Sequence, residues 1–162
     1  MSYINVIQIS EEPVMDSLME EENLYEDPVI MERSDYVSGT VQFDERLGRE
    51  LQDELKDIAT VDIEKRTITF LPKKTIRGKC IDWLKKTAMK YARELKSARK
   101  GSMSSCHHHL RRRVDDFFGI SALFRGTEYY PYVRTSGQVI DSFLAGEISK
   151  KQYIGAVIRI HY

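Results

Sequence analysis

The segment from residue 75 to residue 100 constrains the fold more than any other part of this chain. Its apolar residues recur at helical spacing, so they would line one side of a single helix. Gly101 supplies a natural stop, because glycine is favoured just after a helix C-terminus. The segment therefore predicts one long, basic, amphipathic helix as the outer, partner-facing element. Its apolar side holds Ile76, Cys80, Leu84, Tyr91, Leu95 and Ala98, and its opposite side holds Lys79, Lys86, Lys90 and Arg93.

Charge is sorted along the chain, although the formal net charge is zero. Residues 1–72 contain 18 acidic and 6 basic residues, a net charge of −12, whereas residues 73–113 contain 2 acidic and 14 basic residues, a net charge of +12. Residues 114–162 contain five of each. Blocks of this kind can build opposing surface potentials that select partners. The sequence therefore indicates where a charged partner would bind, and it gives no comparable indication of a catalysed reaction.

The bulk composition is typical of a soluble globular protein, with 41% hydrophobic and 31% charged residues among 162. This length suits one domain over residues 1–162. No apolar run approaches the ~20 residues that span a bilayer, and no basic residue precedes Arg33, as a secretory signal would need. The two cysteines, Cys80 and Cys106, make no disulfide framework. We therefore expect a cytoplasmic protein with no membrane partner.

Local patterns predict an α+β fold, a small, mostly antiparallel sheet packed against several helices on one face. Asp44 is a good N-cap for an amphipathic helix that carries Leu47, Leu51 and Leu55. Residues 104–119 predict a second helix after a flexible linker at 101–105. The C-terminal segment from Lys150 suits a helix at its start, although its end could equally form a closing strand. Strands are expected at 3–9, 60–64, 67–71 and 128–133, a helix at 13–23, and extended, irregular chain at 29–42.

An acidic lead occupies residues 1–32, and within it residues 11–32 contain nine acidic residues and no basic one. The interleaved apolar residues are too many for a disordered spacer, so part of the lead should pack. Three roles stay open for it: acting as a nucleic-acid mimic or as a tail that docks on a basic partner, folding over the chain's own basic helix, or acting as a solubilising segment. Pairing between the −12 and +12 blocks within one chain is the simplest of these arrangements.

The basic block predicts a surface for nucleic acid or another polyanion, because Lys and Arg neutralise phosphates and release counterions. The alternative for this basic block is an ordinary solvated helix face that binds no partner. Trp83 could stack on a base, although filling the core boundary is the more ordinary role. No nucleic-acid-binding motif accompanies the charge. The candidate residues are Lys79, Lys86, Lys90, Arg93, Arg111, Arg112 and Arg113.

A second hypothesis is a protein-interaction or inhibitor module. Tyrosine and arginine are typical interface anchors, and several surround Pro131 in an aromatic and charged patch. The plain alternative is an edge strand with half-buried tyrosines. The candidate partner-binding residues are Glu20, Glu21 and Glu22 in the lead and Tyr129, Tyr130, Tyr132 and Arg134 in the patch.

No catalytic, metal or cofactor site is predicted, and the chain is expected to be a non-enzymatic accessory or regulatory protein. The run Cys106 to His109 has no metal-binding spacing, because adjacent helical residues point about 100° apart. A shared metal with Cys80 or His161 would need an irregular backbone. Cys80 falls on the apolar helix side and suits a buried structural thiol. A small enzyme that uses this thiol or the histidines is the third hypothesis.

Overall fold

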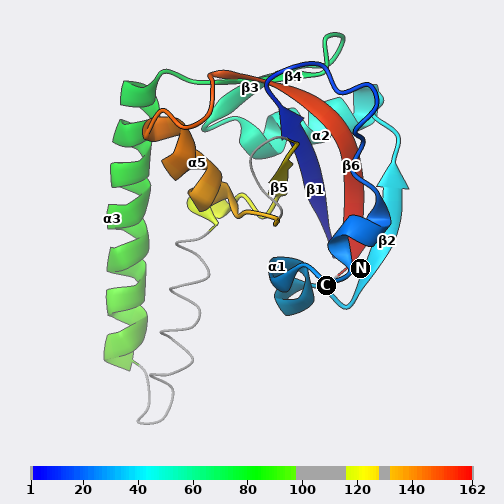
Figure 1. The fold of residues 1–162 in the computed structure, drawn as a ribbon. Coiled ribbons are helices and arrows are strands. Elements are labelled where there is room, and N and C mark those ends of the chain that lie inside the picture. The colour runs from blue at the N-terminus through cyan, green and yellow to red at the C-terminus, as the bar shows by residue number, and fades with distance from the viewer. Residues whose placement is uncertain (1, 98–115, 128–131, 162) are drawn as a thin grey trace.

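A six-stranded sheet organises the computed structural model, which describes residues 2–97, 116–127 and 132–161. The strand order is β3-β4-β6-β1-β5, and β2 also pairs with β6 (Figure 1). Among the strand pairs of the described residues, β1–β5 is parallel and the others are antiparallel. The predicted α+β class is therefore confirmed. The strands are β1 (Tyr3–Ser10), β2 (Tyr36–Val41), β3 (Ala59–Asp62), β4 (Thr67–Phe70), β5 (Leu123–Gly126) and β6 (Lys151–His161), and the helices are α1 (Pro28–Arg33), α2 (Glu45–Leu55), α3 (Lys73–Ser97), α5 (Ser136–Leu144) and the short 3-10 turns η1 (Glu21–Leu24) and η2 (Phe117–Gly119).

Strand β6 is the centre of the sheet. It corrects the expectation of a helix at the start of the segment from Lys150, and it matches the alternative of a closing strand at the end of that segment. Residues 153–161 of this eleven-residue strand pair with β1 along one edge, while the other edge pairs first with β4 and then with β2. Residues 154–158 are all buried, because both faces of this strand are covered. A nearly continuous apolar run of this kind looks the same in a buried strand as in a buried helix. The periodicity alone could not decide between them.

The two faces of the sheet carry separate hydrophobic cores, because successive strand side chains point to opposite faces. One core joins the sheet to α2, α5 and the first turns of α3. The other core joins the sheet to residues 11–32, the part of the acidic lead that follows β1. Met19, Leu24 and Ile30 of this part pack on Ile4, Val6, Ile158 and Ile160 of the sheet. The expectation that all helices cover one face is therefore wrong: α1 and η1 close the second face.

Helix α2 and the hairpin that follows it match their predicted positions. The Asp44 carboxylate accepts a hydrogen bond from the Leu47 N–H at 2.8 Å, which is the expected N-cap. Gln52 of α2 then satisfies the outer edge of β3, because its amide binds the Val61 N–H at 2.7 Å and the Ala59 carbonyl at 3.4 Å. This side chain occupies backbone groups of an edge strand that could otherwise pair with another chain.

Three local predictions from the sequence are wrong. Residues 13–20 contain no helix, and helical structure in the lead is limited to η1 and α1. Within the segment expected to be extended and irregular at 29–42, α1 is helical up to Arg33, and residues 36–41 are extended as expected but form the regular strand β2. Of the strand expected at 128–133, residues 128–131 lie outside the described residues, and Tyr132 and Val133 are not in a strand; β5 forms earlier, at Leu123–Gly126. Side chains from elsewhere in the fold, such as the Glu21 carboxylate that binds the Thr40 N–H, help to fix these segments.

None of the helices in the described ranges is long and apolar enough to cross a bilayer.

Candidate nucleic-acid interface

The basic helix α3 is anchored at its N-terminal end. It follows Pro72, whose carbonyl accepts the Ile76 N–H at 3.1 Å. Ile76 and Cys80 are buried in the core beside α5. Lys73 sits 5.5 Å from the centre of the Phe143 ring, and the Arg77 guanidinium donates to the Leu144 carbonyl at 3.4 Å. These contacts fix the direction in which the rest of the helix runs.

Beyond Cys80 the helix is held by aromatic packing. Trp83 is half-buried, with its ring 5.5 Å from that of Phe117 and 5.9 Å from that of Phe118 in η2. This packing matches the interpretation of Trp83 as a core-boundary residue and leaves the indole poorly placed to stack on a base. Figure 1 shows α3 at one side of the molecule, with its C-terminal half extending past the sheet.

The predicted basic residues of α3 fall into two groups. Lys86, Lys90 and Arg93 are exposed. Lys79 is only 41% exposed, and its ammonium lies 3.6 Å from the Asp57 carboxylate, so its charge is partly matched within the chain. The exposed three occupy one side of the helix over about 10 Å, at 1.5 Å per residue. Lys85 and Lys96 are exposed on the same helix.

The other candidate basic residues, Arg111, Arg112 and Arg113, lie outside the described residues. The same holds for Tyr129, Tyr130, Cys106 and the histidines from 107 to 109. Of the patch around Pro131, the structure describes Tyr132, which is 59% exposed, and Arg134, whose guanidinium donates to the Ser142 hydroxyl at 3.1 Å. The Arg134 backbone also pairs with Phe124 of β5. Arg134 therefore has a structural role in joining β5 to α5.

One arrangement predicted from the sequence had the acidic lead covering the basic helix. In the structure the described part of the lead packs on the sheet instead. Its apolar residues pack on the second face of the sheet. Its polar groups bind there too: the Glu21 carboxylate accepts the Thr40 N–H at 3.2 Å, and the Asp27 carboxylate accepts the Val133 N–H at 2.7 Å. Sheet and lead thus form one side of the molecule, and α3 stands at the other (Figure 1).

The lead exposes both charge and apolar surface. Glu20 and Glu22 are exposed, while Glu21 is partly buried through its bond to β2. Within residues 11–32, four large apolar side chains are also exposed: Met15 at 79%, Leu18 at 51%, Tyr25 at 56% and Met31 at 68%. Exposed apolar groups rimmed by charge are typical of interaction surfaces.

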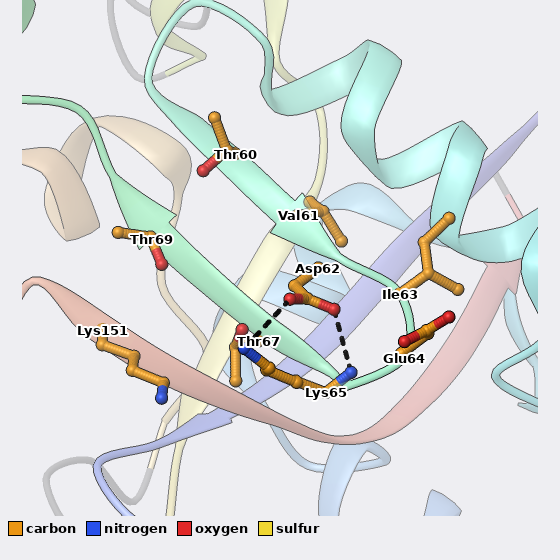
Figure 2. A pocket seen from close by; sticks show the side chains of 9 residues that line it. All are labelled: Thr60, Val61, Asp62, Ile63, Glu64, Lys65, Thr67, Thr69 and Lys151. Atoms are coloured by element: carbon orange, nitrogen blue, oxygen red, sulfur yellow. Dashed lines mark hydrogen bonds and ion pairs between the residues drawn. The ribbon is translucent and has the colours of Figure 1, made fainter.

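A polar hollow of about 540 Å³ lies against the β3–β4 hairpin (Figure 2). Thr60, Thr69 and Lys151 form a row across three neighbouring strands, because Thr60 pairs with Thr69 and Thr69 with Lys151. The Lys65 ammonium lies 3.9 Å from the Asp62 carboxylate across the turn. The hollow is open, and its charges are of both signs, so it has no arrangement of acid, base and nucleophile that indicates a reaction.

Two titratable groups inside the described part of the fold have raised pKa values. Burial raises the pKa of the Cys80 thiol, and the Asp141 carboxylate raises it further, so the reactive thiolate is disfavoured. Burial also raises the pKa of Glu54, although the Ala122 N–H at 2.8 Å opposes this effect. Among the described residues no three His, Cys, Asp or Glu side chains are grouped so that they could hold a metal.

Several important polar residues could not be found from the sequence. Two of them, Gln8 and Asp27, are buried. Two others, Arg33 and Asp116, form a nearly buried ion pair with their side chains 2.7 Å apart. Each joins segments that are far apart along the chain. Their residue types and local spacing carry no signal of this, because their partners are defined only by the tertiary fold.

Comparison with protein families, with curated proteins and with solved structures finds no match for this chain. The function must therefore be argued from the surface, since a fold alone supports many functions.

Proposed function

We propose that this protein is a non-enzymatic accessory or regulatory protein that binds nucleic acid or another polyanion through α3. The observation that carries the proposal is the exposure of Lys86, Lys90 and Arg93 on a helix that stands apart from the acidic lead. Lys86 and Lys90 in particular can be reached by an external polyanion, because the acidic lead packs on the second face of the sheet.

The size of the basic surface bounds the expected affinity. Three cations over about 10 Å can neutralise roughly three phosphates of one DNA strand, whose charges recur every 3.4 Å along the helix axis. Neutralising three phosphates gives a slope of about −2.7 for log K against log salt, or about 40-fold weaker binding between 50 and 200 mM salt. Further contacts from Arg111 to Arg113 would steepen this slope.

The test is binding of the nucleic-acid-free protein to labelled DNA and RNA, single- and double-stranded, across this salt range. Charge reversal at Lys86, Lys90 and Arg93 to Glu should abolish the binding. Reversal of Lys56, Lys65 and Lys150 to Glu is the matched control, because it changes the net charge equally at exposed positions away from α3. An equal loss of nucleic-acid binding in both triple variants would show that net charge alone causes the binding. Binding that survives in the α3 variant would refute the proposal.

A second candidate is a protein-interaction module that uses the acidic lead. The exposed Met15, Leu18, Tyr25 and Met31 favour it, since exposed apolar groups among acids suit a basic, amphipathic helix. A synthetic peptide of residues 73–97 of this chain is a suitable probe. Serine at these four positions should abolish peptide binding if the lead is the docking surface, and unchanged binding would exclude it. Deletion of the lead is a poor test, because it would uncover the second core.

A further inference from the structure

A small pocket of about 130 Å³ lies between the acidic lead and the β1–β5 edge of the sheet, away from α3. Its wall on one side is Ser17, Leu18, Met19 and Asn23 from the lead. On the other side it is formed by Gln8 of β1 and by Arg125 and Thr127 at the end of β5. This volume is that of about four waters at 30 Å³ each. It therefore suits one small ion rather than a chain.

The pocket is a built feature of the fold, because Gln8 fixes its walls. The Gln8 amide group donates to the Ser17 carbonyl at 2.7 Å and to the Thr127 hydroxyl at 3.0 Å. Its carbonyl oxygen accepts the Met19 N–H at 2.9 Å. One buried side chain thus holds both the lead and the end of β5 in place. Since its hydrogen-bonding groups are all used, Gln8 shapes the pocket without offering a free group to a ligand.

Arg125 is the group in this pocket whose bonding is incomplete. The residue is partly buried and its backbone pairs with β1, but its guanidinium has no hydrogen bond, ion pair or ring partner in residues 2–97, 116–127 and 132–161. The other partly buried arginines in these ranges are all paired: Arg33 with Asp116, Arg134 with Ser142, and Arg159 with Asn5 and Glu50. A guanidinium stays charged and carries five donors, so withdrawing it from water without an acceptor is unfavourable.

A second donor lines the same pocket. The Asn23 side-chain oxygen accepts the Glu20 N–H at 2.8 Å, which leaves the Asn23 amide nitrogen as a donor. A planar guanidinium and an amide N–H together suit a single oxyanion, because the guanidinium fork can bind two of its oxygens at once.

We propose that this pocket binds one small oxyanion, a phosphate or a carboxylate group, through Arg125 with support from Asn23. Glu20 and Glu22, next in sequence to the lining residues Met19 and Asn23, are exposed, and their negative charge disfavours a polyanion. The site is thus distinct from α3 in both place and ligand. Because the lead forms one wall, the bound anion also holds the lead on the sheet.

The experiment is titration of the protein with sodium phosphate and with sodium acetate, against sodium chloride at matched ionic strength, by calorimetry and thermal unfolding. The charge-reversed α3 variant serves as the background, so that anion binding at α3 does not contribute. We expect saturable binding of one phosphate or one acetate, with a rise in Tm that chloride does not give. The two arms identify which oxyanion the pocket prefers.

Arg125→Gln should remove the anion-specific rise in Tm, and Arg125→Lys should weaken binding at least tenfold, because lysine keeps the charge and loses the fork. Arg46→Gln, on the exposed side of α2, is the matched control and should bind as the parent does. Hydrogen exchange at Ser17 to Met19 should slow when the anion is bound. Absence of saturable binding by either oxyanion, or an unchanged response in Arg125→Lys, would overturn the proposal.

Discussion

Gly155 of β6 packs so closely against Gln8 of β1 that changing either residue alone should lower the stability of the fold. A Cβ on Gly155 would lie 2.4 Å from the Gln8 side-chain oxygen and 2.7 Å from its amide carbon. The Gln8 side chain cannot move aside, because its oxygen accepts the N–H groups of Met19 and Ala156 at 2.9 and 3.0 Å. We therefore predict that Gly155→Ala destabilises the fold, and that the cost depends on Gln8.

The magnitudes follow from these contacts. Gln8→Ala leaves two buried N–H groups without an acceptor, at about 1–3 kcal/mol each, or about 4 kcal/mol together. Gly155→Ala overpacks a closed site, at about 2 kcal/mol. In the double variant the new methyl group enters space that the Gln8 side chain has left. The double variant should therefore lose about 4 kcal/mol rather than about 6, a coupling of about 2 kcal/mol.

Urea unfolding followed by circular dichroism and by the fluorescence of Trp83, the chain's single tryptophan, measures all three variants. Gly78→Ala is the matched control, because a Cβ on Gly78 meets nothing within 4 Å; it should stabilise α3 by up to about 1 kcal/mol. Additivity of the two single changes within about 0.5 kcal/mol would show that Gln8 and Gly155 do not share the site, and would refute the reasoning.

Three further predictions concern other buried groups. Asp27→Ala should cost about 3 kcal/mol in urea unfolding, because it removes the α1 N-cap and the acceptor of the Val133 N–H; a loss under about 1 kcal/mol would contradict this. The pKa of Glu54 is raised above 4.5 in the folded state, so its protonated form contributes stability below about pH 4.5 that is lost as pH rises through the folded-state pKa. Glu54→Gln should therefore flatten the fall in stability above pH 4.5, and an identical pH profile in wild type and variant would exclude this cause. The raised pKa and burial of Cys80 predict that in a Cys106→Ser background a thiol reagent reacts about tenfold or more slowly with the folded than with the urea-unfolded chain; equal rates would contradict this prediction.

The elements that the sequence predicted well are those whose signals are local. The N-cap at Asp44, the alternation at residues 59–70 and the helical spacing from Ile76 to Tyr91 each act within a few residues. The exposure of Lys86, Lys90 and Arg93 follows from the same spacing, since they lie opposite the apolar side. Lys79 departs from this pattern because its partner, Asp57, is 22 positions away along the chain.

The acidic lead illustrates what local signals miss. Its apolar residues predicted correctly that part of it packs, but they could not say against what. The −12 and +12 blocks suggested that the lead pairs with the basic helix. Exposed ion pairs add little stability, about 0–1 kcal/mol each, whereas burying one leucine or isoleucine contributes about 1.5–3 kcal/mol. Leu24 and Ile30 therefore hold the lead on the sheet, and its charge does not direct it to α3.

By itself the sequence determined the secondary structure of α2, the β3–β4 hairpin and α3, the class of fold, and the sorting of charge, because these depend on residue type and short-range spacing. The tertiary structure alone decided that β6 is a strand buried on both faces and that the lead covers the second face of the sheet. It also decided that Gln8 and Arg125 lie against the lead, and that Asp27 joins the lead to Val133. These outcomes depend on which distant surfaces remain to be covered once the sheet has formed. The hydrophobic effect is not directional, so the spacing of apolar residues does not show which surface they will pack against. The arrangement becomes defined only when the whole chain is packed.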